Sequence, residues 1–330
     1  MKNKSNKKLG IVSLFAGAGG LDQGFKDAGF QTVWANEYDK SIAPTYKKNF
    51  PEVEFDPRSI SDISDEEIRV IAKKHKIVGV IGGPPCQSWS EAGARRGIKD
   101  PRGKLFHDYV RFIKIIKPKF FVAENVHGLI HSRNIDSFNN IKKLFEKEGY
   151  AVDAKLLTSS DFGVPQDRQR VFIIGYALEQ KKKVSFPAPL DDKKVTIKDA
   201  IGYLKNIPIG SKKVMNHDLS PDQTFSSIYM SRNRVRAWDE QSFTILAMDR
   251  HVPLHPSAPK MVKVGKDKMA FVPGHKYRRY TVRECAEIQT FPANFEFIYT
   301  NIRHGYKMIG NAVPVKMAYH VASNIIKDIF

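Results

Sequence analysis

The chain has 330 residues, a formal net charge of +19 and two cysteines, and 42% of its residues are hydrophobic. This length is enough for one large domain, or for one large and one small domain. The cysteine count argues against a disulfide framework or a cysteine-built zinc site, no apolar run is long enough for a membrane span, and the basic start is followed by a strand pattern rather than a signal peptide. We therefore expect a cytoplasmic protein. Its excess of Lys and Arg suits a phosphate backbone, with a merely soluble basic surface as the alternative.

Residues 9 to about 178 alternate short apolar runs with helical patterns, which predicts an α/β fold with a mainly parallel sheet. Helical patterns cover Asp22–Gly29, Lys104–Ile116 and Ser137–Glu148. The predicted strands are Gly10–Phe15, Thr32–Asn36, Ile77–Ile81, Phe120–Glu124, Ala151–Leu157 and Val171–Tyr176. In open sheets of this kind ligands bind at the carboxyl ends of the strands.

The first predicted strand leads into a glycine-rich turn, Phe15-Ala16-Gly17-Ala18-Gly19-Gly20-Leu21. Glycines at this place let the backbone touch a ligand. Glu37 ends the next strand, where a carboxylate can accept both hydroxyls of a ribose, although a solvated strand end is the alternative. The G-x-G-x-x-G spacing of dinucleotide binders is absent, which favours a nucleoside without phosphates, such as S-adenosylmethionine.

The third strand is followed by Gly82-Gly83-Pro84-Pro85-Cys86-Gln87-Ser88. The glycines permit close approach of a substrate, and the prolines limit motion of the loop. Since a reactive thiolate needs access and a shaped environment, Cys86 is interpreted as a nucleophile rather than a buried core thiol.

Two further groups complete a candidate catalytic set. Glu124 ends the fourth strand and, beside Cys86, suggests a general acid, although it could instead satisfy backbone donors at a helix start. Arg168 and Arg170 are two residues apart in an extended segment, so their side chains are expected on one face. Two guanidinium groups there could clamp a carboxylate, a phosphate or a base carbonyl, or they could protect a sheet edge.

After Tyr176 the composition shifts to Lys, Pro, Asp and Ser, which predicts a loop-rich smaller domain. Residues 181–213 contain nine lysines and three aspartates. A second basic cluster is interleaved with aromatic residues, as is typical of a nucleic-acid surface; it comprises Arg232, Arg234, Arg236, Arg250, Lys276, Arg278 and Arg279. Helical patterns return over Glu284–Gln289 and Pro314–Ile329.

In their order and content these segments resemble the bacterial type II C5-cytosine DNA methyltransferases. The resemblance covers nearly the whole chain. Its motifs are Phe15–Gly20, Pro84–Gln87, Glu124–Val126, Gln166–Arg170, Arg278–Ala286 and Gly305–Pro314. It implies a Rossmann-like S-adenosylmethionine-dependent domain in residues 1–182, a target recognition domain in 183–277, and a return to the catalytic domain in 278–330.

The resemblance also implies roles for individual residues. Cys86 would attack C6 of a flipped-out cytosine in duplex DNA, Glu124 would protonate or hydrogen-bond N3, and Arg168 would contact O2, with Arg170 beside it. The implied cofactor-binding residues are Phe15, Gly17, Gly19, Gly20, Leu21, Glu37, Tyr38, Ile60, Pro84, Leu105 and Asn311. The implied DNA-binding residues are Gln87, Ser90, Arg232, Asn233, Arg234, Arg236 and Arg250. No metal is expected, and the protein is expected to be a monomer.

One feature departs from the family pattern. An aspartate usually precedes the isoleucine that follows the second helix, whereas here Ser59 precedes Ile60 and Asp62-Ile63 comes three residues later. Either the serine substitutes for the aspartate or the loop has shifted its register, so the adenine contact made by that aspartate is not assigned.

The target sequence and the substrate class leave alternatives. Met230–Arg236 resembles the GGCC-specific modification methylase, which makes GGCC a first hypothesis for the site, within a restriction–modification system. A tRNA cytosine-5 methyltransferase shares the catalytic motifs, but the variable segment of about 95 residues favours duplex DNA. A catalytically inactive DNA-binding regulator usually lacks the cysteine or the glycines, and a dinucleotide oxidoreductase would need neither Cys86 nor Glu124.

Overall fold

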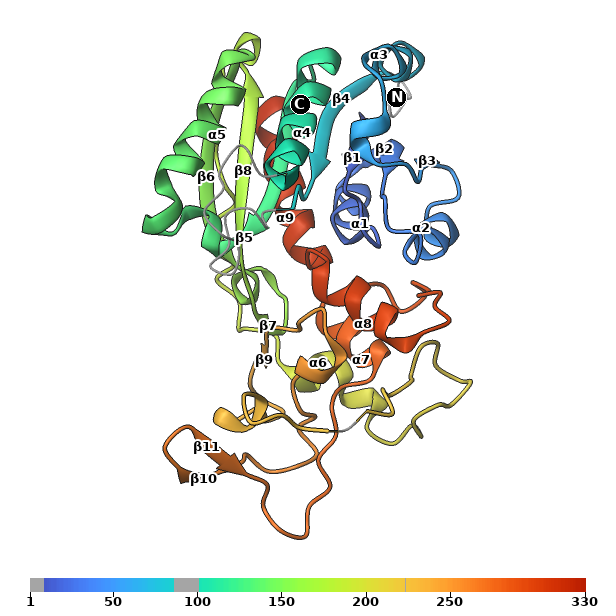
Figure 1. Ribbon diagram of the computed structural model, residues 1–330, viewed down its shortest axis with the longest axis vertical. Helices are drawn as coiled ribbons and strands as arrows, with labels where there is room; N and C mark the ends of the chain where they lie inside the picture. The colour runs from blue at the N-terminus through green and yellow to red at the C-terminus, as the bar shows by residue number, and fades with distance from the viewer. Residues whose placement is uncertain (1–8, 86–100, 223) are drawn as a thin grey trace, which may run out of the picture.

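The computed structural model describes residues 9–85, 101–222 and 224–330. Its centre is a seven-stranded sheet with the strand order β3-β2-β1-β4-β5-β8-β6 (Figure 1). The pairs from β3 to β5 are parallel, whereas β8 runs antiparallel to both of its neighbours. The predicted α/β class with a mainly parallel sheet is confirmed.

All six predicted strands are present, each within two residues of the predicted bounds. They are β1 (Leu9–Leu14), β2 (Phe30–Asn36), β4 (Ile77–Gly82), β5 (Phe120–Val126), β6 (Tyr150–Thr158) and β8 (Gln169–Ala177). The seventh strand, β3 (Glu54–Asp56), was not predicted. It has three residues at the edge of the sheet and no buried residue, so it carries no apolar run that a sequence pattern could show.

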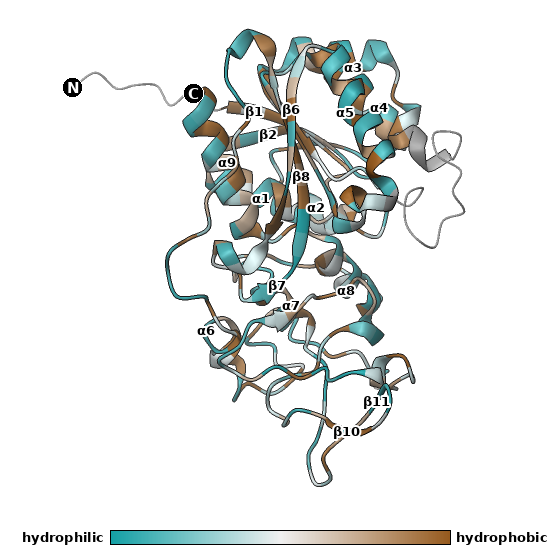
Figure 2. Cartoon of the chain, turned by 90° about the vertical axis from the view of Figure 1, so that its left-hand side faces the viewer, coloured by the Kyte–Doolittle hydropathy of each residue, from teal (hydrophilic) through white to brown (hydrophobic). Residues whose placement is uncertain are grey.

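Helices cover both faces of the sheet, which Figure 2 shows edge-on. One face carries α1 (Gly20–Asp27) and α9 (Val315–Ile329), and the other carries α3 (Asp65–Lys74), α4 (Pro101–Ile116) and α5 (Ile135–Lys147). The apolar sides of these helices pack on the buried strands, giving one hydrophobic core on each face. The three-layer arrangement leaves the carboxyl ends of the parallel strands free to hold a ligand.

The final helix of the chain lies directly beside the first. A Cβ placed on Gly24 in α1 would be 2.4 Å from the Cβ of Ala318 in α9, so the two helices approach more closely than a side chain at that position would allow. The segment that leads into α9 therefore lies at the glycine-rich turn, where a Cβ on Gly20 would be 2.5 Å from the carbonyl oxygen of Val313.

The lower part of the molecule in Figure 1 has few regular elements. Among them are α6 (Ile197–Ile201), β9 (Ser242–Phe243), β10 (Val262–Gly265), β11 (Lys268–Ala270), α7 (Val282–Ile288) and α8 (Ile302–Asn311), whereas α2 (Ala43–Asn49) belongs to the upper part. Buried loop carbonyls need hydrogen-bond donors, because they are removed from water and are not paired in a sheet. Buried guanidinium groups supply some of these donors here. Arg279 donates to the carbonyls of Asp222 and Thr224, and Arg283 to those of Met215 and Phe295.

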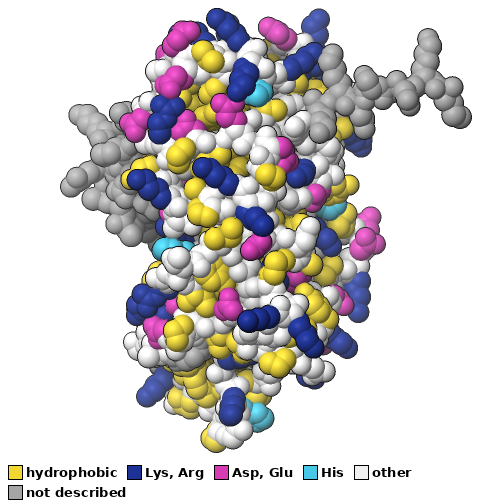
Figure 3. Space-filling view, turned by 90° about the vertical axis from the view of Figure 1, so that its right-hand side faces the viewer, with side chains coloured by type: hydrophobic (Ala, Val, Ile, Leu, Met, Phe, Trp, Pro, Cys, Tyr) yellow, Lys and Arg dark blue, Asp and Glu magenta, His cyan; other side chains and the backbone are white. Residues whose placement is uncertain are grey.

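The positive charge is not gathered into one patch on the face shown in Figure 3, where Lys and Arg side chains are scattered among acidic ones. The net charge therefore favours an anionic partner without locating where it binds. None of the helices in the described part of the chain is both long and apolar enough to cross a membrane. The described residues also contain no group of three or more His, Cys, Asp and Glu side chains that could hold a metal ion.

Candidate active site

A pocket of about 450 Å³ opens at the carboxyl ends of β1, β2, β4 and β5. The start of β8 and the end of α8 complete its wall. Chain segments that are far apart in sequence therefore share one cavity, as the resemblance implied. The lining residues are Ser13, Phe15–Ala18, Gly20–Asp22, Glu37, Asp39, Ile42, Gly82–Pro85, Glu124–Val126, Arg170, Lys307, Met308 and Asn311–Val313.

The glycine-rich turn fits tightly against the rest of the pocket wall. Gly17 and Gly19 have positive φ angles of 56° and 90°, which favour glycine. A Cβ on Gly19 would be 2.3 Å from the Phe50 ring, and one on Gly20 would be 2.5 Å from the carbonyl oxygen of Val313. Close packing thus requires glycine at positions 19 and 20. The spacing of the motif alone could not show this requirement.

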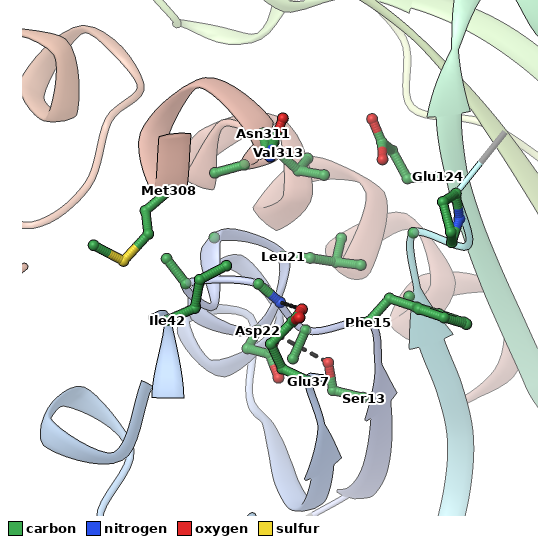
Figure 4. A pocket seen from close by; sticks show the side chains of 18 of the residues that line it. Ser13, Phe15, Leu21, Asp22, Glu37, Ile42, Glu124, Met308, Asn311 and Val313 are labelled. Carbon is green, nitrogen blue, oxygen red and sulfur yellow. Dashed lines mark hydrogen bonds between the residues drawn. The ribbon is translucent and has the colours of Figure 1, made fainter. Parts of the chain in front are cut away.

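Glu37 lies at the end of β2 with its carboxylate facing the glycine turn (Figure 4). Its Oε2 accepts the backbone N–H of Gly17 at 2.9 Å, and its Oε1 accepts that of Asp39 at 2.8 Å. Burial raises the pKa of Glu37 above its ordinary value, while the two N–H donors oppose the rise. The carboxylate is held in one orientation, and each oxygen keeps a lone pair that can accept a hydroxyl group.

A buried carboxylate beneath the turn was not predicted. Asp22 is fully buried and accepts hydrogen bonds from the hydroxyl groups of Ser13, Thr32 and Tyr46 at 2.8–3.1 Å. Burial raises its pKa against these donors. In sequence Asp22 reads only as an acidic residue in the first turn of a helix, which is common at the surface, so no signal marked it. In the structure it fixes β1, β2 and α2 around the cofactor end.

The second carboxylate of the pocket comes from β5. Glu124 is 9% exposed, and the Nε of Arg170 lies 2.8 Å from its Oε1. Burial raises the pKa of Glu124 above its ordinary value, while the charges of Arg170 and Arg168 lower it. A buried carboxyl group with a raised pKa and one cationic partner is suited to holding or donating a proton. Leu21 lies between Glu37 and Glu124 in the view of Figure 4.

The structure places Arg168 and Arg170 in different surroundings. The chain is not one continuous strand there, because β7 (Gln166–Asp167) ends before Arg168 and pairs with β9 in a separate sheet. Arg168 is fully buried and donates to the carbonyl oxygens of Ile245, Gly310 and Ala312. Arg168 is not among the residues that line the pocket, whereas Arg170 is.

The other predicted cofactor residues divide into two groups. Phe15, Gly17, Gly20, Leu21, Glu37, Pro84 and Asn311 line the pocket, with Gly19 beside them in the turn. Three residues are not in its lining: Tyr38 is 69% exposed, and Ile60 and Leu105 belong to or pack against the hydrophobic core under α3 and α4. Ile42 and Met308 line the pocket without having been predicted.

Cys86, Gln87 and Ser90 lie outside the described residues. The loop that leads to them is fixed at its beginning, where the Asn125 side chain donates to the carbonyl of Pro84 at 2.9 Å. A Cβ on Gly83 would be 3.1 Å from the Oε2 of Glu124. The chain therefore passes directly beside Glu124 just before it reaches Cys86.

The structure distinguishes among the predicted DNA-binding residues. Arg232 and Arg250 are exposed, and Arg250 lies 3.5 Å from Asp222. The Asn233 side chain is engaged by the backbone of the protein, since it accepts from the N–H groups of Val235 and Met261 and donates to the carbonyl of Val235.

The other two arginines have more partners inside the protein. Arg234 donates to the carbonyls of Ile228 and Tyr229 and lies over the Tyr229 ring. Arg236 pairs with Asp167 and Glu240, and its guanidinium lies 4.2 Å from the centre of the Phe243 ring. Arg232 and Arg250 are thus the members of the set with the most freedom to reach DNA.

The pocket suits S-adenosylmethionine on the chemistry of its donors and walls. A carboxylate stands ready for ribose hydroxyls, apolar groups from Phe15, Leu21 and Ile42 offer a surface for an adenine ring, and the glycine turn admits close contact. The turn also lacks the spacing that cradles a pyrophosphate. The described residues therefore fit a nucleoside without phosphates.

Comparison with known proteins agrees with this geometry. A profile of the C-5 cytosine-specific DNA methylase family matches residues 9–327. The type II methyltransferase M.NgoPII of Neisseria gonorrhoeae is 48% identical, with 97% of this chain and 96% of that protein aligned. The type II methyltransferase M.MthTI of Methanothermobacter thermautotrophicus is 49% identical, with 97% of this chain and 98% of that protein aligned.

Solved structures show the same fold. A methyltransferase of Entamoeba histolytica, EhMeth, superposes with a TM-score of 0.74 at 18% identity, covering 97% of this chain and 98% of that chain. A protein from an Escherichia coli prophage, described as a DNA modification methyltransferase, has the same TM-score at 23% identity, covering 97% of this chain and 99% of that chain.

Proposed function

The chain belongs to the C-5 cytosine-specific DNA methylase family, and on that premise we propose that it methylates C5 of a cytosine within a specific sequence of duplex DNA. Its relatives named type II methyltransferases support a place in a restriction–modification system. The single observation that carries the proposal is the shared pocket, in which a nucleoside-binding end at Glu37 and a catalytic end at Glu124 meet. A tRNA substrate and an inactive regulator are both less favoured by the relatives.

The residues of the chain would divide the chemistry as follows. Bound S-adenosylmethionine supplies an activated methyl group. Because C5 of cytosine is a weak nucleophile, the Cys86 thiolate adds to C6 and makes C5 nucleophilic. Glu124 holds a proton at N3 as charge develops on the ring. Arg170 pairs with Glu124, and its guanidinium group is available to the carbonyl oxygen O2 of the base.

The reaction ends when a base removes the proton from C5 and the bond between Cys86 and C6 breaks. The target cytosine must leave the helix for any of these contacts, at a cost of a few kcal/mol. At the other end of the pocket, Glu37 would accept the ribose hydroxyls, and Phe15 would lie against the adenine.

Covalent trapping tests this function. Duplexes that carry 5-fluorocytosine in different sequence contexts, GGCC among them, are incubated with the protein and cofactor. Fluorine at C5 prevents the final elimination, so we expect a denaturant-resistant protein–DNA adduct on one sequence only. The Cys86→Ser variant is expected to form no adduct while still binding S-adenosylhomocysteine.

The other outcomes separate the alternatives. An adduct on a sequence other than GGCC keeps the reaction and rejects that recognition site. An adduct on tRNA alone would support the tRNA methyltransferase, and the absence of any adduct would support the inactive regulator.

A further inference from the structure

One buried guanidinium group joins three segments beneath the pocket. Arg168 occupies the single position between β7 and β8 and is fully buried. Its Nη1 donates to the carbonyl of Ile245 at 2.9 Å, and its Nη2 donates to the carbonyls of Gly310 and Ala312 at 2.7 and 3.0 Å. The planar fork of an arginine can hold several acceptors in a fixed geometry, which a lysine cannot.

Two of these segments are also in direct backbone contact. A Cβ on Gly310 would be 2.4 Å from the backbone N of Ala247 and from the carbonyl carbon of Leu246, so α8 touches the chain just after Ile245. At these distances a side chain of any size would push the two segments apart. The glycine allows an approach that carries a displacement of either segment to the other.

A second buried polar network runs parallel to Arg168. The Gln166 side chain accepts the backbone N–H of Ile245 at 2.9 Å and donates to the Gln289 side chain at 3.0 Å. Gln289 in turn donates to the carbonyl of Ile309 at 2.9 Å. Buried polar networks with these groups paired hold a single arrangement, because breaking one bond leaves a polar atom without a partner in a medium of low dielectric constant.

Arg168 contacts one segment that lines the pocket and a second segment in the part of the chain expected to read DNA. Ala312, whose carbonyl accepts from Arg168, lines the pocket together with Asn311, and Arg170, two residues further along in β8, pairs with Glu124. Ile245, in the second segment, precedes the exposed residues Leu246 and Met248 of the segment expected to read DNA. A group that binds in the pocket and a duplex that binds the recognition segment would therefore both act on the same hydrogen bonds.

We propose that Arg168 is a positioning residue that couples cofactor binding to DNA binding, by holding the carbonyls on either side of Asn311 and the carbonyl of Ile245 with one guanidinium group. The proposal rests on the proposed function and adds to it the route by which the two substrates influence each other. Coupling of this kind is reciprocal. S-adenosylhomocysteine, the product formed from the cofactor, should therefore strengthen DNA binding by the same factor as DNA strengthens the binding of S-adenosylhomocysteine.

The test compares binding without turnover. The duplex has the DNA sequence that forms the covalent adduct in the trapping experiment, with ordinary cytosine in place of 5-fluorocytosine. Its dissociation constant from the protein is measured with and without saturating S-adenosylhomocysteine. We expect the product to tighten DNA binding by about fivefold or more in the unaltered protein. In Arg168→Lys, which keeps the charge but loses the fork, this ratio should fall to about one.

Arg279→Lys is the matched control. Arg279 is also a buried guanidinium group that donates to two loop carbonyls, but those of Asp222 and Thr224, away from the pocket. It should keep the ratio of the unaltered protein even if it loses thermal stability. A ratio that survives in Arg168→Lys, or that falls equally in both variants, overturns the proposal.

Hydrogen exchange of the unaltered protein provides a second measurement if Arg168→Lys fails to fold. S-adenosylhomocysteine should slow exchange in residues 242–248 as well as in 309–313, and leave 224–230 unchanged. Protection confined to the pocket segments overturns the proposal. Failure of the unaltered protein to bind either the product or DNA would reject the proposed function itself, whereas independent binding of both rejects only the coupling.

Discussion

At the scale of single residues, the pocket places two carboxylates in different electrostatic surroundings. Glu37 accepts two backbone N–H groups, which stabilise its charged form, whereas Glu124 has a guanidinium group on one side and no backbone donor that the structure shows. Burial raises the pKa of both. The difference in donors suits Glu37 to accepting hydroxyl groups and Glu124 to exchanging a proton.

Glu124→Gln is the first prediction at this scale. The amide can still form a hydrogen bond but cannot supply a proton, so methyl transfer should fall by about 10²–10⁴-fold. Since the proposed mechanism uses Glu124 in its protonated form and its pKa is raised, activity of the unaltered protein should decline as pH rises through that pKa. The variant should lose this alkaline decline while binding S-adenosylhomocysteine normally. A pH–rate profile that keeps the same decline in Glu124→Gln would assign the titration to another group.

At the scale of elements, the hydrophobic pattern of the sequence predicted the longer strands and missed the three-residue edge strand β3. The six longer strands were predicted to within two residues, because β1, β4, β5 and β8 carry continuous buried apolar runs and β2 and β6 carry apolar residues between polar ones. The position of Arg168 could not be predicted, since nothing in the run Gln166–Arg170 shows that the extended chain breaks there and changes partners. Asp22 was missed for a similar reason, because its three hydroxyl donors come from β1, β2 and α2, which only the fold brings together.

The glycine turn gives a prediction at the same scale. In Gly20→Ala the new Cβ would meet the carbonyl of Val313 at 2.5 Å and displace the turn from the C-terminal wall of the pocket. Overpacking of this kind costs about 1–3 kcal/mol, so S-adenosylhomocysteine should bind about tenfold or more weakly in isothermal titration.

Gly29→Ala is the control for this change. Unlike Gly20, Gly29 has a positive φ, 108°, and a Cβ there would have nothing within 4 Å. That variant should lose about 1–2 kcal/mol of stability from backbone strain and keep its affinity for the product. Equal affinities in the two variants would show that the contact between the turn and Val313 does not shape the pocket.

At the scale of the whole molecule, residues 183–277, which we propose as the recognition segment, are attached to the sheet through few regular elements. The pair β7–β9 is two residues long, and the ion pair between Arg236 and Asp167 lies beside it. The net charge of +19 should make DNA binding weaken steeply with salt, because each phosphate contact releases counterions. Charge that is already paired within the protein contributes less to this slope than charge that is free.

Arg232 and Arg236 separate these two cases. Arg232 is exposed and has no ion pair with any other described residue, so Arg232→Gln should weaken DNA binding and reduce the slope of log K against log salt by about one if it contacts a phosphate. Arg236→Gln should change the slope less and lower the free energy of unfolding by about 1 kcal/mol, because this side chain pairs with Asp167 and stacks on Phe243. Lys73→Gln serves as the control, because it removes the same charge from the exposed side of α3. It should leave the slope unchanged. An equal loss of slope in all three variants would mean that DNA responds to the total charge of the protein, and that the recognition segment is not the surface that the phosphates touch.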